Sequence, residues 1–183
     1  MLNRQLLSPT SIVVVGASNN ITKPGGKILK TLLEHEYKGQ LYAVNPHDEC
    51  VQGVTTVRSV SDLPEVELAI LAIPAKSCPE AVAVLTKEKN TKAFIIISGG
   101  FSEMGTEGAL LEKEIVEYVN QSGACLIGPN CIGVLTHDYA GVFTEPIPRL
   151  EPTGVDFVSG SGGTAVFIME SAIPKGLTFS RVI

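Results

Sequence analysis

The chain has 183 residues, enough for one domain or for one domain and part of a second. Its net charge of −5 and its lack of basic clusters argue against nucleic acid as a main partner. Although 44% of the residues are hydrophobic, no apolar run reaches the roughly 18 to 20 residues that a membrane span needs. The first residues also lack the apolar core of a signal peptide. We therefore expect a cytoplasmic protein without a membrane partner.

The first strong pattern is a β-branched run, Ser11–Val15, that ends at Gly16-Ala17-Ser18. A helical pattern, Gly26–Glu36, follows a few residues later. A buried strand, a loop of small residues and a helix, in this order, are typical of the phosphate-binding corner of nucleotide-binding α/β folds. Backbone N–H groups can approach a phosphate closely there, and Lys23 would add a positive charge.

Short apolar runs and helical patterns alternate along the chain. The runs predict strands at Ser11–Val15, Gln40–Val44, Leu68–Ile73, Ala93–Ile97 and Ala124–Ile127. The helical patterns lie at Gly26–Glu36, Cys78–Lys87 and Thr106–Gln121, with a short helical turn at Val57–Leu63. This alternation predicts an α/β fold, a Rossmann-like parallel sheet with helices on both faces.

Right-handed crossovers place the loops that follow parallel strands on one edge of the sheet, where ligands bind. Five such loops consist of small, turn-forming or polar residues: Gly16-Ala17-Ser18, Asn45-Pro46-His47, Pro74-Ala75, Ser98-Gly99-Gly100-Phe101 and Gly128-Pro129-Asn130-Cys131. Each alone could be only a turn, but five on one edge favour a binding site.

The prolines between Pro146 and Pro152 indicate a stiff linker. We therefore expect a first domain over residues 1–145, a Pro-rich linker over 146–153 and the start of a second domain over 154–183. The last part predicts a strand, a Ser/Gly loop, a helix and a strand, at Gly154–Val158, 159–163, Thr164–Ala172 and Thr178–Ile183. So short a piece cannot bury its own core. Either it packs on the first domain or, as we favour from the apolar run at its end, the chain is the front of a longer protein.

Cysteines and histidines are scattered, at Cys50, Cys78, Cys125 and Cys131 and at His35, His47 and His137. No cysteine pair has the C-x-x-C spacing of a zinc or redox site. We expect reduced, mostly structural thiols and no metal site. A nucleophilic Cys131 has no histidine nearby in sequence to support it.

The end of the second predicted strand bears on which nucleotide binds. An NAD site places an acidic residue there for the ribose, but this strand runs into Asn45-Pro46-His47. The G-x-G-x-x-G fingerprint and the P-loop pattern are also missing. Coenzyme A fits better, because its pyrophosphate suits the Gly16–Gly26 corner and its 3′-phosphate suits His47.

Several motifs together resemble one family. The run from Leu7 to Ser18 resembles the opening of the nucleoside-diphosphate-forming acyl-CoA synthetases, which include ADP-forming acetyl-CoA synthetases and, more distantly, the succinyl-CoA synthetase α subunit. Further motifs follow in that family's order: Val44-Asn45-Pro46, Ala72-Ile73-Pro74, Ser98-Gly99-Gly100-Phe101-Ser102-Glu103 and Gly128-Pro129-Asn130-Cys131-Ile132-Gly133. The resemblance covers essentially the whole chain.

The resemblance implies a CoA-binding Rossmann-like domain followed by the first β-α-β unit of a flavodoxin-like domain. It implies CoA phosphate contacts from Gly16, Ala17, Ser18, Lys23, Pro24 and Gly25. It places Asn45, Pro46 and His47 near the adenosine, and Ile73, Pro74, Ser98, Gly99 and Gly100 along the pantetheine. Asn130 and Cys131 would lie towards the reacting end, and Ser161, Gly162 and Gly163 would form a phosphate site that faces a phosphohistidine. The family usually has lysine where this chain has His47.

The family converts an acid, CoA and a nucleoside triphosphate into acyl-CoA, a nucleoside diphosphate and phosphate, through an acyl phosphate and a phosphohistidine. None of the three histidines lies in a motif like the phosphohistidine loop, and no ATP-grasp domain is present. We therefore assign no catalytic residue and expect the chain alone to bind CoA or acyl-CoA without turnover. Further domains or an ATP-grasp β subunit would supply the catalytic groups. Whether the chain forms a homo-oligomer is left open by the sequence. The alternatives are a non-catalytic CoA- or nucleotide-sensing module and, with less support, an NAD(H)-binding Rossmann regulator.

Overall fold

The main sheet of the protein has seven strands in the order β3-β4-β2-β1-β5-β6-β7. The structure, a computed structural model, describes residues 2–148 and 150–183. The strands are β1 (Ser11–Val15), β2 (Gln40–Val44), β3 (Cys50–Val51), β4 (Val54–Val57), β5 (Leu68–Leu71), β6 (Ala93–Ile96) and β7 (Cys125–Ile127). All neighbours pair in parallel except β3 and β4, which form an antiparallel hairpin at one end of the sheet.

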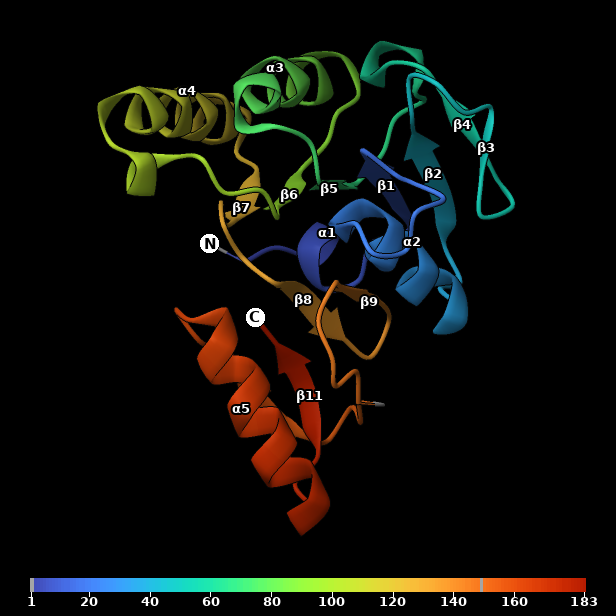
Figure 1. The fold of residues 1–183 in the computed structure, drawn as a ribbon, viewed down its shortest axis with the longest axis vertical. Helices are drawn as coiled ribbons and strands as arrows, with labels where there is room; N and C mark the ends of the chain where they lie inside the picture. Colours follow the sequence, from blue (N-terminus) through green and yellow to red (C-terminus); the bar gives the residue numbers. More distant parts are fainter. Residues whose placement is uncertain (1, 149) are drawn as a thin grey trace.

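Helices cover both faces of this sheet, with α3 and α4 on one face and α1 and α2 on the other (Figure 1). They are α1 (Arg4–Leu7), α2 (Pro24–Glu34), α3 (Cys78–Glu88) and α4 (Thr106–Ser122), with short 3₁₀ turns η1 (Val60–Asp62), η2 (Ala75–Ser77) and η3 (Ser102–Met104). None of the helices in the described part of the chain is long and apolar enough to cross a membrane. The α/β fold predicted from the sequence is confirmed.

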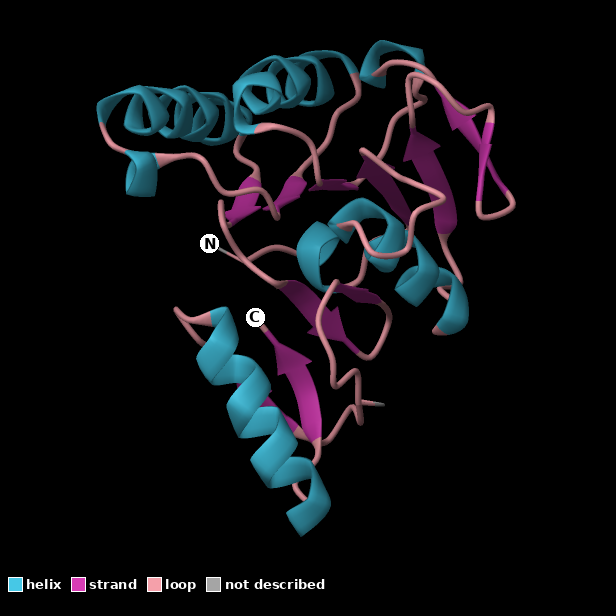
Figure 2. Cartoon of the chain, viewed as in Figure 1, coloured by secondary structure: helices cyan, strands magenta, loops and turns pink. Residues whose placement is uncertain are grey.

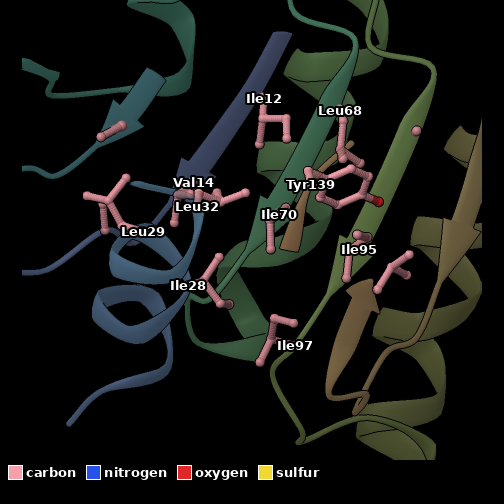
Figure 3. Packing of buried hydrophobic residues seen from close by; sticks show 14 of the residues in the cluster. Ile12, Val14, Ile28, Leu29, Leu32, Leu68, Ile70, Ile95, Ile97 and Tyr139 are labelled. Atoms are coloured by element: carbon pink, nitrogen blue, oxygen red, sulfur yellow. The ribbon is translucent and has the colours of Figure 1, made fainter. Parts of the chain in front are cut away.

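Strand β1 lies at the centre of the sheet and is buried along its whole length. Its side chains alternate between the two faces, as in any strand. Ile12 and Val14 pack with Ile28 and other residues of α2 (Figure 3), whereas Val13 and Val15 belong to the cluster on the α3 and α4 side. A strand buried on both faces appears in sequence as a continuous apolar run, which is why Ser11–Val15 could be predicted to the residue.

A second, four-stranded sheet follows, in the order β10-β11-β8-β9. It consists of β8 (Gly133–Thr136), β9 (Ala140–Val142), β10 (Val155–Phe157) and β11 (Phe179–Val182), with α5 (Gly162–Ala172) and the 3₁₀ turn η4 (Ile173–Lys175) between the last two strands (Figure 2). Strand β11 pairs antiparallel with β8, so the final β-α-β unit is joined to an earlier hairpin. Leu135, Met169 and Phe179 are in its small core.

Several elements were not predicted from the sequence. Strands β8 and β9 lie inside the range that we assigned to the first domain, yet they pair in the sheet of the last β-α-β unit. The strand pairing therefore crosses the boundary that we predicted at residue 145, and the domain boundaries stay a prediction. Val57 ends β4 and does not begin a helical turn, although Ser59 caps η1. In the Pro-rich segment, the N–H of Glu151 donates to the carbonyl of Phe179 (2.8 Å), so the segment is fastened to β11.

One buried tyrosine links the N-terminal helix to the β8–β9 hairpin. The hydroxyl of Tyr139 donates to the carbonyl of Leu6 (2.8 Å), and both side chains are almost wholly inaccessible to solvent. Figure 3 shows the Tyr139 ring among Leu68, Ile70 and Ile95 of the main sheet. Burial raises the pKa of Tyr139 well above its ordinary value, so the hydroxyl stays a neutral donor.

We expect Tyr139→Phe to lower the free energy of unfolding by about 1–3 kcal/mol, because it leaves the buried carbonyl of Leu6 without a partner. Urea unfolding followed by circular dichroism would measure the change. Tyr118→Phe is the matched control, since that hydroxyl donates to Glu114 at the surface and its loss should cost less than about 0.5 kcal/mol. Equal effects of the two substitutions would contradict the role given to Tyr139.

Candidate functional site: the loops at the carboxyl edge of the main sheet

The candidate site lies where β1 has β2 on one side and β5 on the other. The connections that leave β1 and β5 run to opposite faces of the sheet, and this opens a crevice at their carboxyl ends. Figure 1 shows the loop after β1 entering α2 on one face, while the loop after β5 leads to α3 on the other. Ligands of open α/β sheets bind at this place.

A continuous series of contacts joins the five loops predicted from the sequence. The N–H groups of Gly16 and Ala17 donate to the carbonyl of Val44 (3.1 and 3.2 Å), and a β-carbon added to Gly16 would lie 2.9 Å from Ile73. On the other side of β5, the hydroxyl of Ser98 donates to the carbonyl of Ile73. The N–H of Asn130 in turn donates to the carbonyl of Ser98 (3.0 Å). The fold therefore brings the five loops together on one edge.

The first loop is packed so closely that only glycine fits at three of its positions. A β-carbon on Gly25 would lie 2.1 Å from the carbonyl oxygen of Gly16, and one on Gly26 would lie 2.1 Å from that of Asn20. Gly16 has a positive φ of 87° and would meet the carbonyl of Ala72 at 2.5 Å. Backbone rather than side chains thus forms the floor of the crevice.

Helix α2 begins at this floor, and its first turn faces the loop. Pro24 is its first residue, two positions before the predicted start, and proline suits this place because no N–H is needed there. The N-cap residue, Lys23, makes no side-chain capping hydrogen bond. The N–H groups of a first helical turn have no partners within the helix, and the positive end of the helix dipole lies beside them. An anionic group is the ligand that such an end favours.

The loop after β2 is a compact turn around Asn45. Its side-chain oxygen accepts from the N–H groups of His47 (2.8 Å) and Asp48 (2.9 Å), and its side-chain amide donates to the carbonyl of Ala17 (2.9 Å). Asn45 therefore occupies the place where an NAD-binding sheet has an acidic residue. His47 and Pro46 are exposed beside it, which leaves the imidazole accessible to a ligand.

The loop after β6 is held by Glu103, a residue that we did not assign to the site. Its carboxylate accepts from the N–H groups of Gly100 (2.6 Å) and Phe101 (3.2 Å). The bond from Gly100, the larger of these influences, lowers the pKa of Glu103. Gly100 has a φ of 109°, which suits glycine. The quoted family motif already contained Glu103, so the signal for it was present in the sequence.

The loop after β7 carries Asn130 and Cys131 on an unusual backbone. The Gly128–Pro129 peptide is cis, and Asn130 has a positive φ of 56°. The thiol of Cys131 points back to the carbonyl of Ile96 (3.3 Å). Burial raises the pKa of Cys131 to about 11, so the sulfur is a neutral thiol near pH 7. This argues for a structural role and against a nucleophile.

A cavity of about 220 Å³ separates this loop from the loop that enters α5. Its walls include Asn130, Cys131, Ser159, Gly160 and Gly162. Of the three residues predicted to bind phosphate here, Gly162 lines the cavity. The Ser161 side chain instead caps α5, accepting from the N–H of Thr164 (3.3 Å), and Gly163 stands in open space.

A larger hollow, of about 670 Å³, lies at the other end of α2, between that helix and the turn from β8 to β9. His35 and His137 line it. It contains none of the residues that the sequence assigns to the site, and its walls mix charged side chains such as Glu34 and Lys38 with apolar ones such as Leu135.

Comparison with known proteins identifies the family. A family profile described as "CoA binding domain" matches residues 10–137. The chain is 37% identical over 177 residues to the acetate–CoA ligase [ADP-forming] II subunit alpha of Pyrococcus furiosus, covering 96% of this chain and 38% of that protein. Thus the chain spans less than half the length of this relative.

Solved structures of similar fold support the same family. A Pyrococcus horikoshii protein of known crystal structure superposes with a TM-score of 0.88 at 37% identity, covering 98% of this chain and 41% of that one. A dinucleotide-forming acetyl-coenzyme A synthetase 1 of Candidatus Korarchaeum cryptofilum, in complex with phosphate and ADP, gives a TM-score of 0.87 at 29% identity, covering 98% and 38%.

The fold and the profile together define the class: the chain belongs to the CoA binding domain family. Over nearly its whole length it is similar to ADP-forming acetate–CoA ligases, and the resemblance found in the motifs is confirmed.

We expect Gly25→Ala to destabilise the protein by about 2 kcal/mol or more, because the added methyl group would overlap the backbone carbonyl of Gly16. Gly163→Ala is the control, since its new methyl group enters open space in α5 and should leave stability unchanged or raise it by up to about 1 kcal/mol. Urea unfolding of both variants measures the difference. A harmless Gly25→Ala would show that the close packing of the loop is not required.

The cysteines give a second prediction. With 5,5′-dithiobis(2-nitrobenzoic acid) at pH 8, we expect fast labelling of exposed Cys50 and slow labelling of Cys131, whose raised pKa leaves few thiolates. Burial likewise raises the pKa of Cys78, to about 12. The variant Cys50→Ser should lose the fast phase. A fast phase that survives in Cys50→Ser and disappears in Cys131→Ser would restore the nucleophile hypothesis.

Proposed function

We propose that this chain is the coenzyme A-binding part of a nucleoside-diphosphate-forming acyl-CoA synthetase. The observation that carries the proposal is the crevice at the ends of β1 and β5, where glycine backbone and an uncapped helix start meet an Asn-Pro-His turn. CoA is then a substrate that is acylated at its thiol. The first loop would hold its pyrophosphate, and His47 would lie near its 3′-phosphate.

The rest of the predicted site supports a path for the pantetheine arm. From the first loop, Ile73, Pro74, Ser98, Gly99 and Gly100 lead along the sheet edge towards Asn130 and Cys131. The 220 Å³ cavity lies at that end, beside the Ser159–Gly162 loop. We assign the thiol of CoA to this end and the predicted phosphate contacts to Gly162 and its neighbours Ser161 and Gly163.

The family reaction joins an acid to CoA at the expense of a nucleoside triphosphate, through an acyl phosphate and a phosphohistidine. No histidine within the described residues lines the cavity, since His47 lies at the other end of the site and His35 and His137 line the hollow beyond α2. We therefore propose that further domains or a partner subunit of the ATP-grasp type supply the phosphohistidine and the nucleotide. This chain by itself would bind CoA and not turn over.

Isothermal titration with CoA, dephospho-CoA and NAD tests the proposal. We expect CoA to bind most tightly and dephospho-CoA several-fold more weakly, because dephospho-CoA lacks the 3′-phosphate. NAD should bind most weakly, because no carboxylate at the end of β2 can accept hydrogen bonds from its ribose. Tighter binding of NAD would support a nucleotide-binding regulator and contradict the proposal.

The variants His47→Ala and His47→Lys examine the turn after β2. Alanine should remove the preference for CoA over dephospho-CoA, and lysine, with its full positive charge, should increase it several-fold. The affinity for dephospho-CoA is the internal control and should stay the same in both variants. If CoA and dephospho-CoA already bind equally to the unaltered chain, His47 does not contact the 3′-phosphate.

A further inference from the structure

The loop that would receive the CoA phosphates has few apolar contacts to hold it. Between Ala17, which is buried, and Gly25, all residues from Asn19 to Pro24 are exposed, and Ile21 is 47% accessible. A loop without buried side chains samples many conformations unless polar contacts restrict it. Ordering it on binding would then weaken affinity.

The hairpin of β3 and β4 supplies such contacts. Its two-residue turn is Gln52-Gly53, and both residues have positive φ (50° and 85°), as in the turn type that best joins two short antiparallel strands. From this turn the side-chain amide of Gln52 donates to two carbonyls at once, those of Ser18 (2.8 Å) and Gly26 (2.8 Å). One nitrogen therefore bridges the beginning of the loop and the first turn of α2.

The loop also contacts the hairpin through a side chain of its own, that of Asn19. The side-chain oxygen of Asn19 accepts from the backbone N–H of Gln52 (2.9 Å), and its amide donates to the carbonyl of Cys50 (3.3 Å). Together with the bond from Asn45 to Ala17, two loop carbonyls and the carbonyl of Gly26 in the first turn of α2 are thus turned towards side-chain amides of the segment from β2 to β4. Carbonyl oxygens repel phosphate, so an arrangement that engages them elsewhere favours an anion on the other side of the loop.

We propose that Gln52 is a positioning residue that holds the Gly16–Gly26 loop in its phosphate-binding conformation before the ligand arrives. The proposal rests on the proposed function, because the ligand is CoA. Gln52 itself does not touch the ligand. The hairpin extends the sheet beyond β2 by two short strands (Figure 1). In this proposal it also holds the first loop of the site in place.

Two substitutions separate positioning from stability. Gln52→Met keeps the length of the side chain but removes both donors. Gln52→Asn is one methylene too short to bridge the carbonyls, but Asn-Gly is a preferred sequence for this turn, so the hairpin itself should be as stable as before. Gln121→Met, at an exposed position of α4 far along the chain, is the control for the substitution itself.

The first measurement needs no ligand. Hydrogen exchange of the 183-residue chain, followed by mass spectrometry, should show faster exchange in peptides covering residues 16–27 in both Gln52 variants, and unchanged exchange in Gln121→Met. Unchanged exchange in the Gln52 variants would overturn the proposal, whatever the chain binds.

The second measurement uses CoA and dephospho-CoA. Both Gln52 variants should bind the two ligands about tenfold more weakly and by the same factor, because the loop holds the pyrophosphate that the ligands share. His47→Ala should weaken CoA alone. Unaltered dissociation constants in both Gln52 variants would overturn the positioning role. Absence of CoA binding by the unaltered chain would instead overturn the proposed function, and the exchange data would still decide whether Gln52 holds the loop.

Discussion

The site depends on one close approach of backbone to backbone, where the first turn of α2 rests on the end of β1. The carbonyl of Gly16 and the α-carbon of Gly25 are too near for any side chain to stand between them, and Gly16 in turn lies against the carbonyl of Ala72 at the end of β5. This contact fixes where α2 begins and therefore where the N–H groups of its first turn point.

The other loops build outward from that contact. Asn45 ties the turn after β2 to Ala17, Ser98 ties the loop after β6 to Ile73, and Asn130 ties the loop after β7 to Ser98. Most of these bonds join backbone to backbone or a short polar side chain to backbone. An elongated ligand with a charged end and a neutral arm suits such a surface, and this is the shape of coenzyme A. We propose that the charged end binds at the helix start and His47, and that the arm follows the uncharged loops.

Sequence patterns predicted most of the main sheet because its central strands β1, β5 and β6 are buried on both faces. Ser11–Val15 and Gln40–Val44 agree with the structure to the residue, and α3 and α4 begin where predicted. The shortest strands were not predicted from the sequence. Strands β3, β8 and β9 have two to four residues each, too few for a period-two pattern to rise above neighbouring turns. Strand β8 in addition pairs with β11 across more than forty residues of sequence, as Leu135 opposite Val182 shows.

The sequence by itself determined the fold class and the five loops, because these follow from local patterns: apolar runs, helical periodicity and clusters of Gly, Pro and Asn. The phosphate-binding role of the first loop stays a prediction. The sequence also pointed to coenzyme A, through an absent acidic residue and a histidine. Only the tertiary structure decided how the loops are held. Gln52 reaches the first loop across 34 and 26 residues of sequence, Glu103 folds back on Gly100, and Tyr139 reaches Leu6 across 133. Single amide, carboxyl and hydroxyl groups leave no periodic trace in a sequence, and their partners are chosen by the packing that brings distant segments together.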